Sequence, residues 1–250
     1  MLAILSDIHG NLEALTSVLA RIDARGDVDE IICLGDVIGY GPDPTLCLDL
    51  VMQRCSTVLM GNHDFAVFYE PYSFNVQAEQ ASYWTRQQFE QEPDQQKRNR
   101  RWRFLAAMPF VHTRPGLKAV HASPRRPINE YIFPDDIYTN APKFTALFEV
   151  VERICFVGHT HVPGAFLEGP DFYSPVELDG RLELGREKAI VNVGSVGQPR
   201  DRDPRASFVV LDGDVVEFCR VEYDLETTID KIGKVEMLDD FLRARLRDGK

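Results

Sequence analysis

Five short segments of the sequence place histidine, aspartate or asparagine directly after an apolar stretch. They are Asp7-Ile8-His9, Gly35-Asp36, Gly61-Asn62-His63-Asp64, His121 and Gly158-His159-Thr160-His161. The apolar stretches predict buried β-strands, and ligands of open α/β sheets bind where such strands end. We therefore expect side chains from all five segments to meet at one edge of a sheet.

The donor atoms of this set determine what chemistry it could perform. Carboxylate and amide oxygens and imidazole nitrogens, without a thiolate, suit borderline divalent metals such as Mn, Fe or Zn. The candidate ligands are Asp7, His9, Asp36, Asn62, His121, His159 and His161. They exceed the four donors of a closed structural zinc site, and they suffice for two ions if one carboxylate bridges. Two ions about 3.5–4 Å apart can clamp a phosphoryl group and activate a water molecule.

The spacing within each segment is informative only in combination with the others. Residues two apart on an extended chain point to the same side, as in the Asp7/His9 and His159/His161 pairs. A single histidine after a strand is more often structural, and the sequence Asn-His-Asp alone also fits a turn. The five segments together favour a metal site. His112 has no such neighbours and is predicted to be structural.

The elements that must position these residues alternate between strand and helix in the first part of the chain. Strands are expected at residues 2–5, 31–34 and 57–60, and helices at residues 12–25 and 44–54. Asn11 is expected to cap the first helix and Gly26 to end it, while Pro44 opens the second helix. This alternation predicts an α/β fold with parallel strands and covering helices.

The rest of the chain is predicted to hold a helical segment followed by further strands. Residues 74–107 are rich in Gln, Glu and Arg and predict helices. Later elements are expected as strands at 117–120, 154–157, 189–193, 207–211 and 215–221, and helices at 141–151, 225–232 and 235–247. Asp179-Gly180 and Asp212-Gly213 predict tight hairpin turns. We expect a single domain over residues 1–250, with a helical, cap-like insertion at about residues 70–110.

Length and composition exclude several classes of protein. The 250 residues are 44% hydrophobic and 27% charged, as in ordinary globular proteins, and carry a formal net charge of −11. This charge argues against a protein that holds nucleic acid non-specifically or binds membranes through a basic surface. No apolar stretch approaches the ~20 residues that span a bilayer, and no secretory signal is recognisable. An odd cysteine count without CxxC spacing predicts reduced thiols, so we expect a cytoplasmic protein.

The five segments, in this order, resemble the motifs of the calcineurin-like metallophosphoesterases. That pattern is DxH, GD, GNH followed by an acid, a lone His and GHxH, and here it covers residues 7–161. Residues 35–42 and 192–200 look like the bacterial and archaeal phosphodiesterase branch. The Asp-Arg-Gly sequence of phosphoprotein phosphatases is absent, and Asp64 stands where they usually have Glu. The resemblance implies a layered α/β/β/α sandwich.

The resemblance also implies a role for each matching residue. Asp7, His9 and His161 would hold one metal, Asn62, His121 and His159 would hold the other, and Asp36 would bridge both. His63, oriented by Asp64, would act as a general acid or stabilise phosphate charge. A hydroxide bridging the two divalent ions (Mn, Fe, Zn or Ni) would attack phosphorus in line.

The implied activity is that of a dinuclear, phosphodiesterase-like phosphoric ester hydrolase acting on a small phosphodiester or phosphomonoester, nucleotides included. Arg200, Arg125 and Arg126 are candidate substrate-binding residues because guanidinium groups bind phosphate in a bidentate manner, with surface ion pairs as the alternative. Two other functions stay open: hydrolysis of dinucleoside polyphosphates, and a non-catalytic scaffold that binds a partner. The presence of His63 and all seven candidate ligands favours the enzyme. The physiological substrate, the metal and the oligomeric state are left open.

Overall fold

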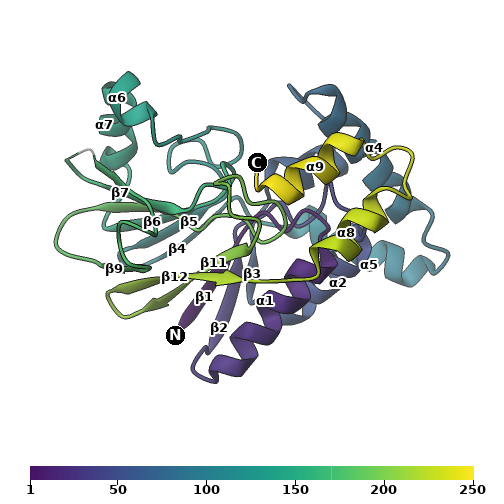
Figure 1. The fold of residues 1–250 in the computed structure, drawn as a ribbon, viewed down its shortest axis with the longest axis horizontal. Coiled ribbons are helices and arrows are strands. Elements are labelled where there is room, and N and C mark those ends of the chain that lie inside the picture. Colours follow the sequence, from purple (N-terminus) through teal and green to yellow (C-terminus); the bar gives the residue numbers. More distant parts are fainter. Residues whose placement is uncertain (170) are drawn as a thin grey trace.

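Apolar stretches from both halves of the chain pair into two six-stranded sheets (Figure 1). The computed structural model describes residues 1–169 and 171–250. The first sheet has the order β3-β2-β1-β11-β12-β9 and the second the order β4-β5-β6-β10-β7-β8. The strands of the first sheet are β1 (Leu2–Leu5), β2 (Glu30–Cys33), β3 (Thr57–Val58), β9 (Arg181–Glu183), β11 (Ala206–Asp212) and β12 (Val215–Val221). Those of the second are β4 (Val111–Arg114), β5 (Leu117–Val120), β6 (Ile154–Val157), β7 (Gly164–Leu167), β8 (Asp171–Tyr173) and β10 (Ala189–Asn192).

Each sheet contains a parallel set of strands. β1, β2 and β3 run parallel, and so do β5, β6 and β10. β1 lies in the middle of its sheet, where Ile4 pairs with Ile32 of β2 and with Val209 of the antiparallel β11. Because parallel strands place their carboxyl ends at the same edge, the loops after β1, β2 and β3 emerge together.

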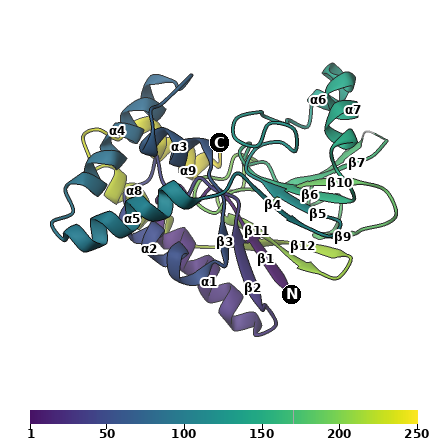
Figure 2. The same cartoon turned by 180° about the vertical axis from the view of Figure 1, so that it is seen from behind.

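Helices flank the two sheets (Figures 1 and 2). They are α1 (Leu12–Arg25), α2 (Pro44–Arg54), α3 (Asn62–Phe68), α4 (Val76–Glu90), α5 (Gln95–Ala107), α6 (Asp136–Thr139), α7 (Ala141–Glu149), α8 (Leu225–Ile232) and α9 (Asp240–Asp248). One apolar core joins α1 and α2 to the first sheet, a second lies between the sheets, and a third joins α7 to the second sheet. The predicted α/β/β/α layering is therefore confirmed.

Local sequence signals explain where the first helices begin and end. The Asn11 side chain accepts a hydrogen bond of 3.1 Å from the amide of Ala14, and Gly26 ends α1 with a φ of 70°. Pro44 occupies the first turn of α2, where its missing N–H costs nothing. These elements have the bounds that the sequence predicts. Helices α4 and α5 fall within the predicted insertion at residues 70–110; the division into a single domain stays a prediction.

The structure corrects several predictions of secondary structure. The short strands β4, β7, β8 and β9 and the helices α3 and α6 were not expected. Asp179-Gly180 does not close a hairpin. The strand before it, β8, belongs to the second sheet, whereas the strand after it, β9, pairs with β12 in the first sheet. The last helix begins at Asp240 rather than near residue 235. Among the described residues, no helix has both the length and the apolar character needed to cross a membrane.

Candidate metal centre

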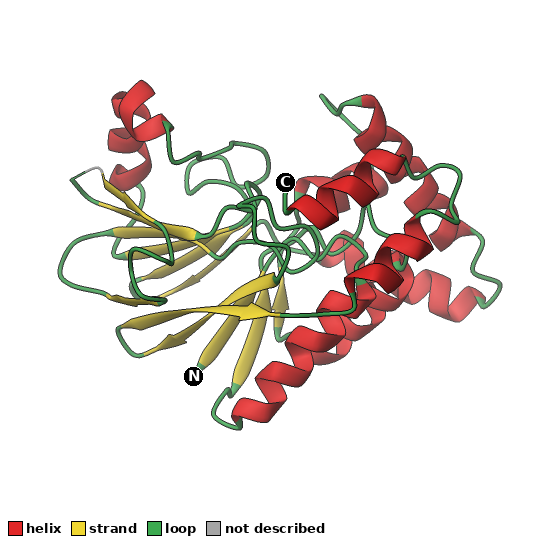
Figure 3. Cartoon of the chain, viewed as in Figure 1, coloured by secondary structure: helices red, strands yellow, loops and turns green. Residues whose placement is uncertain are grey.

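The candidate ligands lie in loops that follow strands of both sheets. Asp7 and Asp36 come after β1 and β2, Asn62 begins α3 after β3, and His121 and His159 follow β5 and β6. Loops from the two sheets gather near the middle of the molecule, between the sheets and the helices (Figure 3). The first sheet contributes mainly oxygen donors and the second only imidazoles, so the complete donor set exists only where the two sheets meet.

Five of these ligands have a strained backbone. Their φ angles are 55° at Asp7, 49° at His9, 51° at Asp36, 66° at His159 and 60° at His161. Non-glycine residues rarely adopt this left-handed region, although Asp and His tolerate it better than most, and each instance costs about 1–3 kcal/mol. Such strain persists where the surroundings over-determine the geometry, which is typical of functional sites.

One group of ligands consists of Asp7, His9 and His161, whose donor atoms converge in the interior. His161 Nε2 lies 3.1 Å from Asp7 Oδ1 and 3.2 Å from His9 Nε2. His161 Nδ1 lies 2.6 Å from the carbonyl oxygen of Gln198, to which it donates, and this leaves the Nε2 lone pair facing the group. Donors that each lie about 2.0–2.2 Å from one ion are about 3.0–3.5 Å apart, as these atoms are.

A second group forms around His121. Its Nε2 atom lies 3.0 Å from Asn62 Oδ1, 3.2 Å from His159 Nδ1 and 3.3 Å from Asp36 Oδ2. All of these donors except those of Asn62 belong to side chains with relative exposures of 4% or less. The spacing again matches a set of ligands around one cation.

Asp36 connects the two groups. The Oδ2 atom that faces His121 also lies 3.8 Å from His9 Nε2. The other carboxylate oxygen, Oδ1, accepts a hydrogen bond of 2.8 Å from the amide of His63. A Cβ atom at Gly61 would collide with this carboxylate, so only glycine leaves room for the contact. The sequence pattern and the geometry therefore agree on which residue lies between the groups.

The electrostatics of the site favour a bound cation. Burial alone would raise the pKa of Asp36, but the facing His121 imidazole lowers it well below its usual value. Burial would likewise lower the pKa of His121, but the Asp36 carboxylate raises it to about 9. Burial, with the charge of His121, lowers the pKa of His159 to about 3. The ionised Asp36 carboxylate and the neutral His159 imidazole are thus in the protonation states that bind metals, whereas His121 would release a proton when an ion binds.

The residues fit divalent metal ions by three independent measures. Their donors are carboxylate and amide oxygens and imidazole nitrogens, they converge in overlapping groups, one of which joins His63 to His9 and Asp36, and all but Asn62 are buried. Buried charges of this kind are otherwise costly unless they are paired. All seven ligands expected from the sequence lie in this one site.

Comparison with known proteins identifies the family. The family model of calcineurin-like phosphoesterases matches residues 1–163. The chain belongs to this family. The crystal structure of a metallophosphoesterase from Sphaerobacter thermophilus is similar to this structure over 100% of this chain and 98% of that chain, with 37% identity and a TM-score of 0.83.

Two sequence relatives extend the comparison. An uncharacterized protein of Methanocaldococcus jannaschii is 35% identical over 260 residues, which cover 100% of this chain and 98% of the relative. A symmetrical bis(5′-nucleosyl)-tetraphosphatase of Erwinia tasmaniensis is 32% identical over 63 residues, which cover 24% of this chain and 23% of the relative. The similarity to the protein of Methanocaldococcus jannaschii thus extends beyond the motif-bearing residues 7–161.

His63 lies beside the two groups. Its ring centroid is 4.9 Å from that of His9, 4.4 Å from that of Tyr40 and 4.6 Å from that of Phe74. Its Nδ1 atom is buried without a hydrogen-bond partner among the described residues. Burial, with the positive charge of Arg200, lowers its pKa to about 4. His63 is therefore a neutral imidazole that faces the site.

Asp64 occupies a different place from the one predicted. Its Oδ2 atom accepts hydrogen bonds from the amides of Asp36 (2.7 Å) and Gly61 (3.1 Å), and its Oδ1 atom accepts one from Ile38 (3.2 Å). It forms no hydrogen bond with the His63 ring. The expected carboxylate–imidazole contact is therefore wrong for this structure, because α3 directs Asp64 toward three main-chain donors. Asp64 instead fixes the loop that carries Asp36.

The three candidate arginines are in different environments. Arg125 is paired with Glu130 at 2.5 Å, the surface ion pair that was the alternative expectation. Arg126 lines a cavity beside Asn62 and His159. Arg200 donates to Gln198 Oε1 at 2.7 Å, and its buried Nε atom has no hydrogen-bond partner in the described part of the chain. Of the three, Arg200 is the one whose charge acts on the site histidines. Burial is the main cause of the lowered pKa of His161, and the positive charge of Arg200 is the next.

Arg245 on α9 is a residue of this region that sequence reasoning missed. Burial and the nearby positive charge of Arg200 lower its pKa to about 10. The end of α9 is held against the loop after Arg200, since the amide of Arg202 donates to the carbonyl of Gly249 at 2.7 Å. Within residues 1–169 and 171–250, neither Arg200 nor Arg245 pairs with an Asp or Glu side chain. No motif spacing links position 245 to the other site residues, so the sequence carries no signal for it.

Proposed function

We propose that this protein is a dinuclear, metal-dependent phosphoesterase that cleaves a P–O bond of a small phosphodiester or phosphomonoester. The observation that carries the proposal is the pair of ligand groups joined by Asp36, whose Oδ2 atom faces both His121 and His9. Asp7, His9 and His161 would hold one divalent ion, and Asn62, His121 and His159 the other. When bound, the ions supply Lewis-acid charge for the phosphoryl oxygens and an activated water.

His63 would act on the phosphate through its ring N–H. Because burial keeps the imidazole neutral, it donates a hydrogen bond to a phosphoryl or leaving-group oxygen rather than carrying a permanent charge. Its packing between the Tyr40 and Phe74 rings limits its rotation, so the N–H is held in one direction. A pre-oriented donor of this kind stabilises charge as it develops on oxygen.

Arg200 and Arg245 would bind the non-bridging oxygens of the phosphate. Among the described residues, neither guanidinium group pairs with an Asp or Glu side chain, although Arg245 Nε donates to the carbonyl of Lys250 at 2.7 Å, and an anion near both groups would relieve their mutual repulsion. The ligand we propose is thus a small phosphorylated molecule or nucleotide. The net charge of −11 does not support a nucleic-acid polymer as a non-specific ligand.

A second candidate function is the hydrolysis of a dinucleoside polyphosphate. The local similarity to a bis(5′-nucleosyl)-tetraphosphatase supports it, as does a second arginine beyond the metal groups. A non-catalytic scaffold has less support, because partner binding does not require seven converging donors or a buried His63 nitrogen without a hydrogen-bond partner among the described residues.

The test begins with metal-stripped protein to which Mn, Ni, Zn or Mg is added back separately. We expect restored hydrolysis of bis(p-nitrophenyl) phosphate, faster than that of p-nitrophenyl phosphate. His63→Ala should retain its metal, measured by elemental analysis, but lose about 10²–10⁴ in rate, the usual contribution of a positioned proton-transfer group. Loss of metal from that variant would show that His63 is a ligand instead.

Product analysis with diadenosine tetraphosphate separates the two enzymatic candidates. Release of two ADP molecules at a rate well above that of diester cleavage would favour the second candidate. If protein with two ions per chain cleaves none of the three compounds, the proposed activity on simple esters is contradicted. The non-catalytic scaffold then becomes the favoured function.

A further inference from the structure

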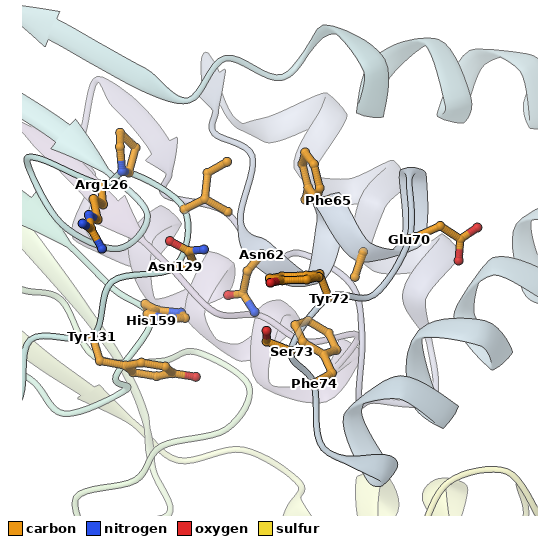
Figure 4. Close-up of a pocket in the computed structure, with 13 residues that line it drawn as sticks. Asn62, Phe65, Glu70, Tyr72, Ser73, Phe74, Arg126, Asn129, Tyr131 and His159 are labelled. Atoms are coloured by element: carbon orange, nitrogen blue, oxygen red, sulfur yellow. The ribbon is translucent and has the colours of Figure 1, made fainter.

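A cavity of about 420 Å³ opens directly onto the second ligand group (Figure 4). Asn62 and His159 of that group form part of its wall. Residues 65–74 line it from the first half of the chain, and residues 126–131 line it from the loop after β5. This volume is within the range of small-molecule sites, and a phosphate held at the ligand group would have its substituent in this space.

Aromatic rings flank the cavity from two directions. The Tyr131 ring stacks on the His159 imidazole at 4.0 Å and an interplanar angle of 27°, and Phe133 stacks behind it at 5.3 Å. On the other side, Tyr72 and Phe74 line the cavity (Figure 4). Phe74 is anchored by its contact with His63, but Tyr72 is 83% exposed, and no described aromatic side chain stacks on it. An unpaired ring on a cavity wall is a surface on which a planar group can stack.

The cavity also carries polar groups that could contact the edge of such a ring. Ser73 and Asn129 line it, and no hydrogen bond of either side chain occurs within the described residues. Glu70 and Arg126 also line the cavity, and Glu70 is paired with Arg86. A purely hydrocarbon ring would leave the amide of Asn129 unused. A heteroaromatic ring with donors and acceptors at its edge uses both the aromatic faces and the polar groups.

We propose that this cavity holds the base of a nucleotide whose phosphate lies at the ligand groups, with Tyr72 as a specificity-determining residue that stacks on the base. The proposal rests on the proposed function for the position of the phosphate. It adds the substrate class, a nucleoside phosphate ester, and the residues that distinguish it from other phosphate esters.

The experiment compares two ligands that differ only in the base, adenosine 5′-monophosphate and ribose 5-phosphate. Their affinities for the metal-loaded protein are measured by isothermal titration calorimetry. Stacking of one base on an aromatic side chain is worth about 1–3 kcal/mol, so the nucleotide should bind about 5-fold to 150-fold more tightly. Equal affinities would overturn the proposal.

Tyr72→Ala is the decisive variant, and Tyr138→Ala is its matched control. Tyr138 is 85% exposed, like Tyr72, but lies on α6 outside the cavity. Tyr72→Ala should reduce the preference for the nucleotide at least threefold, whereas Tyr138→Ala should keep the wild-type preference. A preference that Tyr72→Ala leaves intact would contradict the assignment of this residue.

These outcomes are distinct from a failure of the proposed function. The titrations measure binding and need no turnover. A wild-type protein that hydrolyses bis(p-nitrophenyl) phosphate but binds the two ligands equally would retain the phosphoesterase assignment and lose the base site. A protein that prefers the nucleotide but cleaves no ester would show the reverse.

Discussion

Asp36 has contacts that a single substitution would remove together. One of its oxygens faces both ligand groups, and the other accepts the amide of His63. Its backbone is strained, with a φ of 51°, and its main-chain amide donates a hydrogen bond to the Asp64 carboxylate. The residue is thus fixed from both its main chain and its side chain before any ion binds.

We predict that Asp36→Asn lowers metal content and activity together. The amide preserves the shape of the side chain but removes the charge that two cations would share, and one of its two acceptor atoms. Elemental analysis should give fewer than two ions per chain, with a loss of turnover of at least about 10²-fold. Asp49→Asn is the control, because Asp49 is paired with Arg101 away from the site. Two bound ions with full turnover in Asp36→Asn would refute the bridging role.

At this scale the sequence predicted residues better than it predicted contacts. The seven candidate ligands stand in short motifs at strand ends, so their types and order indicated a shared site. The partner of Asp64 could not be predicted, because it depends on the direction in which α3 leaves Gly61. The contact of the Gln198 carbonyl with His161 and the proximity of Arg245 to Arg200 could not be predicted either. Both join residues far apart in the sequence, and no motif marks them.

Among the elements, helices with clear end signals were predicted more accurately than short strands. α1 has a capping asparagine, a periodic apolar face and a terminal glycine, and α2 has a proline in its first turn. β4 is largely exposed and lacks the alternation of a half-buried strand, and β9 alternates but has only three residues, too few to indicate a strand. Such edge strands form because a neighbouring strand offers hydrogen bonds, which is a tertiary effect.

An ion pair between strands of different sheets makes acid stability testable. Arg114 at the end of β4 contacts Glu30 of β2 at 2.5 Å. This contact, with a hydrogen bond from Ser56, lowers the pKa of Glu30 to about 2 from 4.5. A depressed carboxylate pKa stabilises the fold above pH about 4.5, and that contribution is lost as the pH falls toward 2.

We therefore predict that Glu30→Gln reduces the free energy of unfolding at pH 6 by less than about 1 kcal/mol, since the pair is partly exposed. The difference from wild type should shrink as the pH falls from 4.5 and vanish near pH 2. Urea unfolding across this range measures it, with exposed Glu149→Gln as the control. A difference that does not change with pH would contradict the role of this ion pair.

The proposed phosphate contact of Arg245 on α9 is testable without disturbing the candidate ligands. Arg245→Gln should raise the KM for bis(p-nitrophenyl) phosphate about 10-fold to 100-fold, because a hydrogen bond to a charged group is worth about 1.5–3 kcal/mol. Arg247→Gln on the same helix is the control, since Arg247 is paired with Glu226. Equal KM values in both variants would place Arg245 outside the substrate site.

Considered as a whole, the molecule joins its two sheets at the candidate centre. Asp7, Asp36 and Asn62 come from loops of the first sheet, and His121 and His159 from loops of the second. The core between the sheets is apolar, so the sheets would pack without ions. Ions held by ligands from both sheets would add to the stability of that packing.

We predict that metal loading raises the thermal midpoint of the whole chain. A ligand at 100 times its Kd stabilises by about 2.7 kcal/mol, which corresponds to about 5–10 °C for a chain of this size. Scanning calorimetry with and without chelator measures the shift. His161→Asn should lose most of it, whereas His112→Asn should retain it, because His112 lies on β4 outside both groups. A full shift in His161→Asn would argue that the stabilising ions bind elsewhere.

The pairing of β1 with β11 has a consequence for the newly synthesised chain. All seven candidate ligands have been translated by residue 161, but β1 acquires its antiparallel neighbour only when residues 206–212 emerge. Until then, one edge of β1 lacks its hydrogen-bonding partner, and contacts of such long sequence separation form late and slowly. A nascent chain whose first 161 residues have left the ribosome would therefore carry every candidate ligand but lack β11 beside β1, so that metal binding is expected only late in the synthesis of this protein.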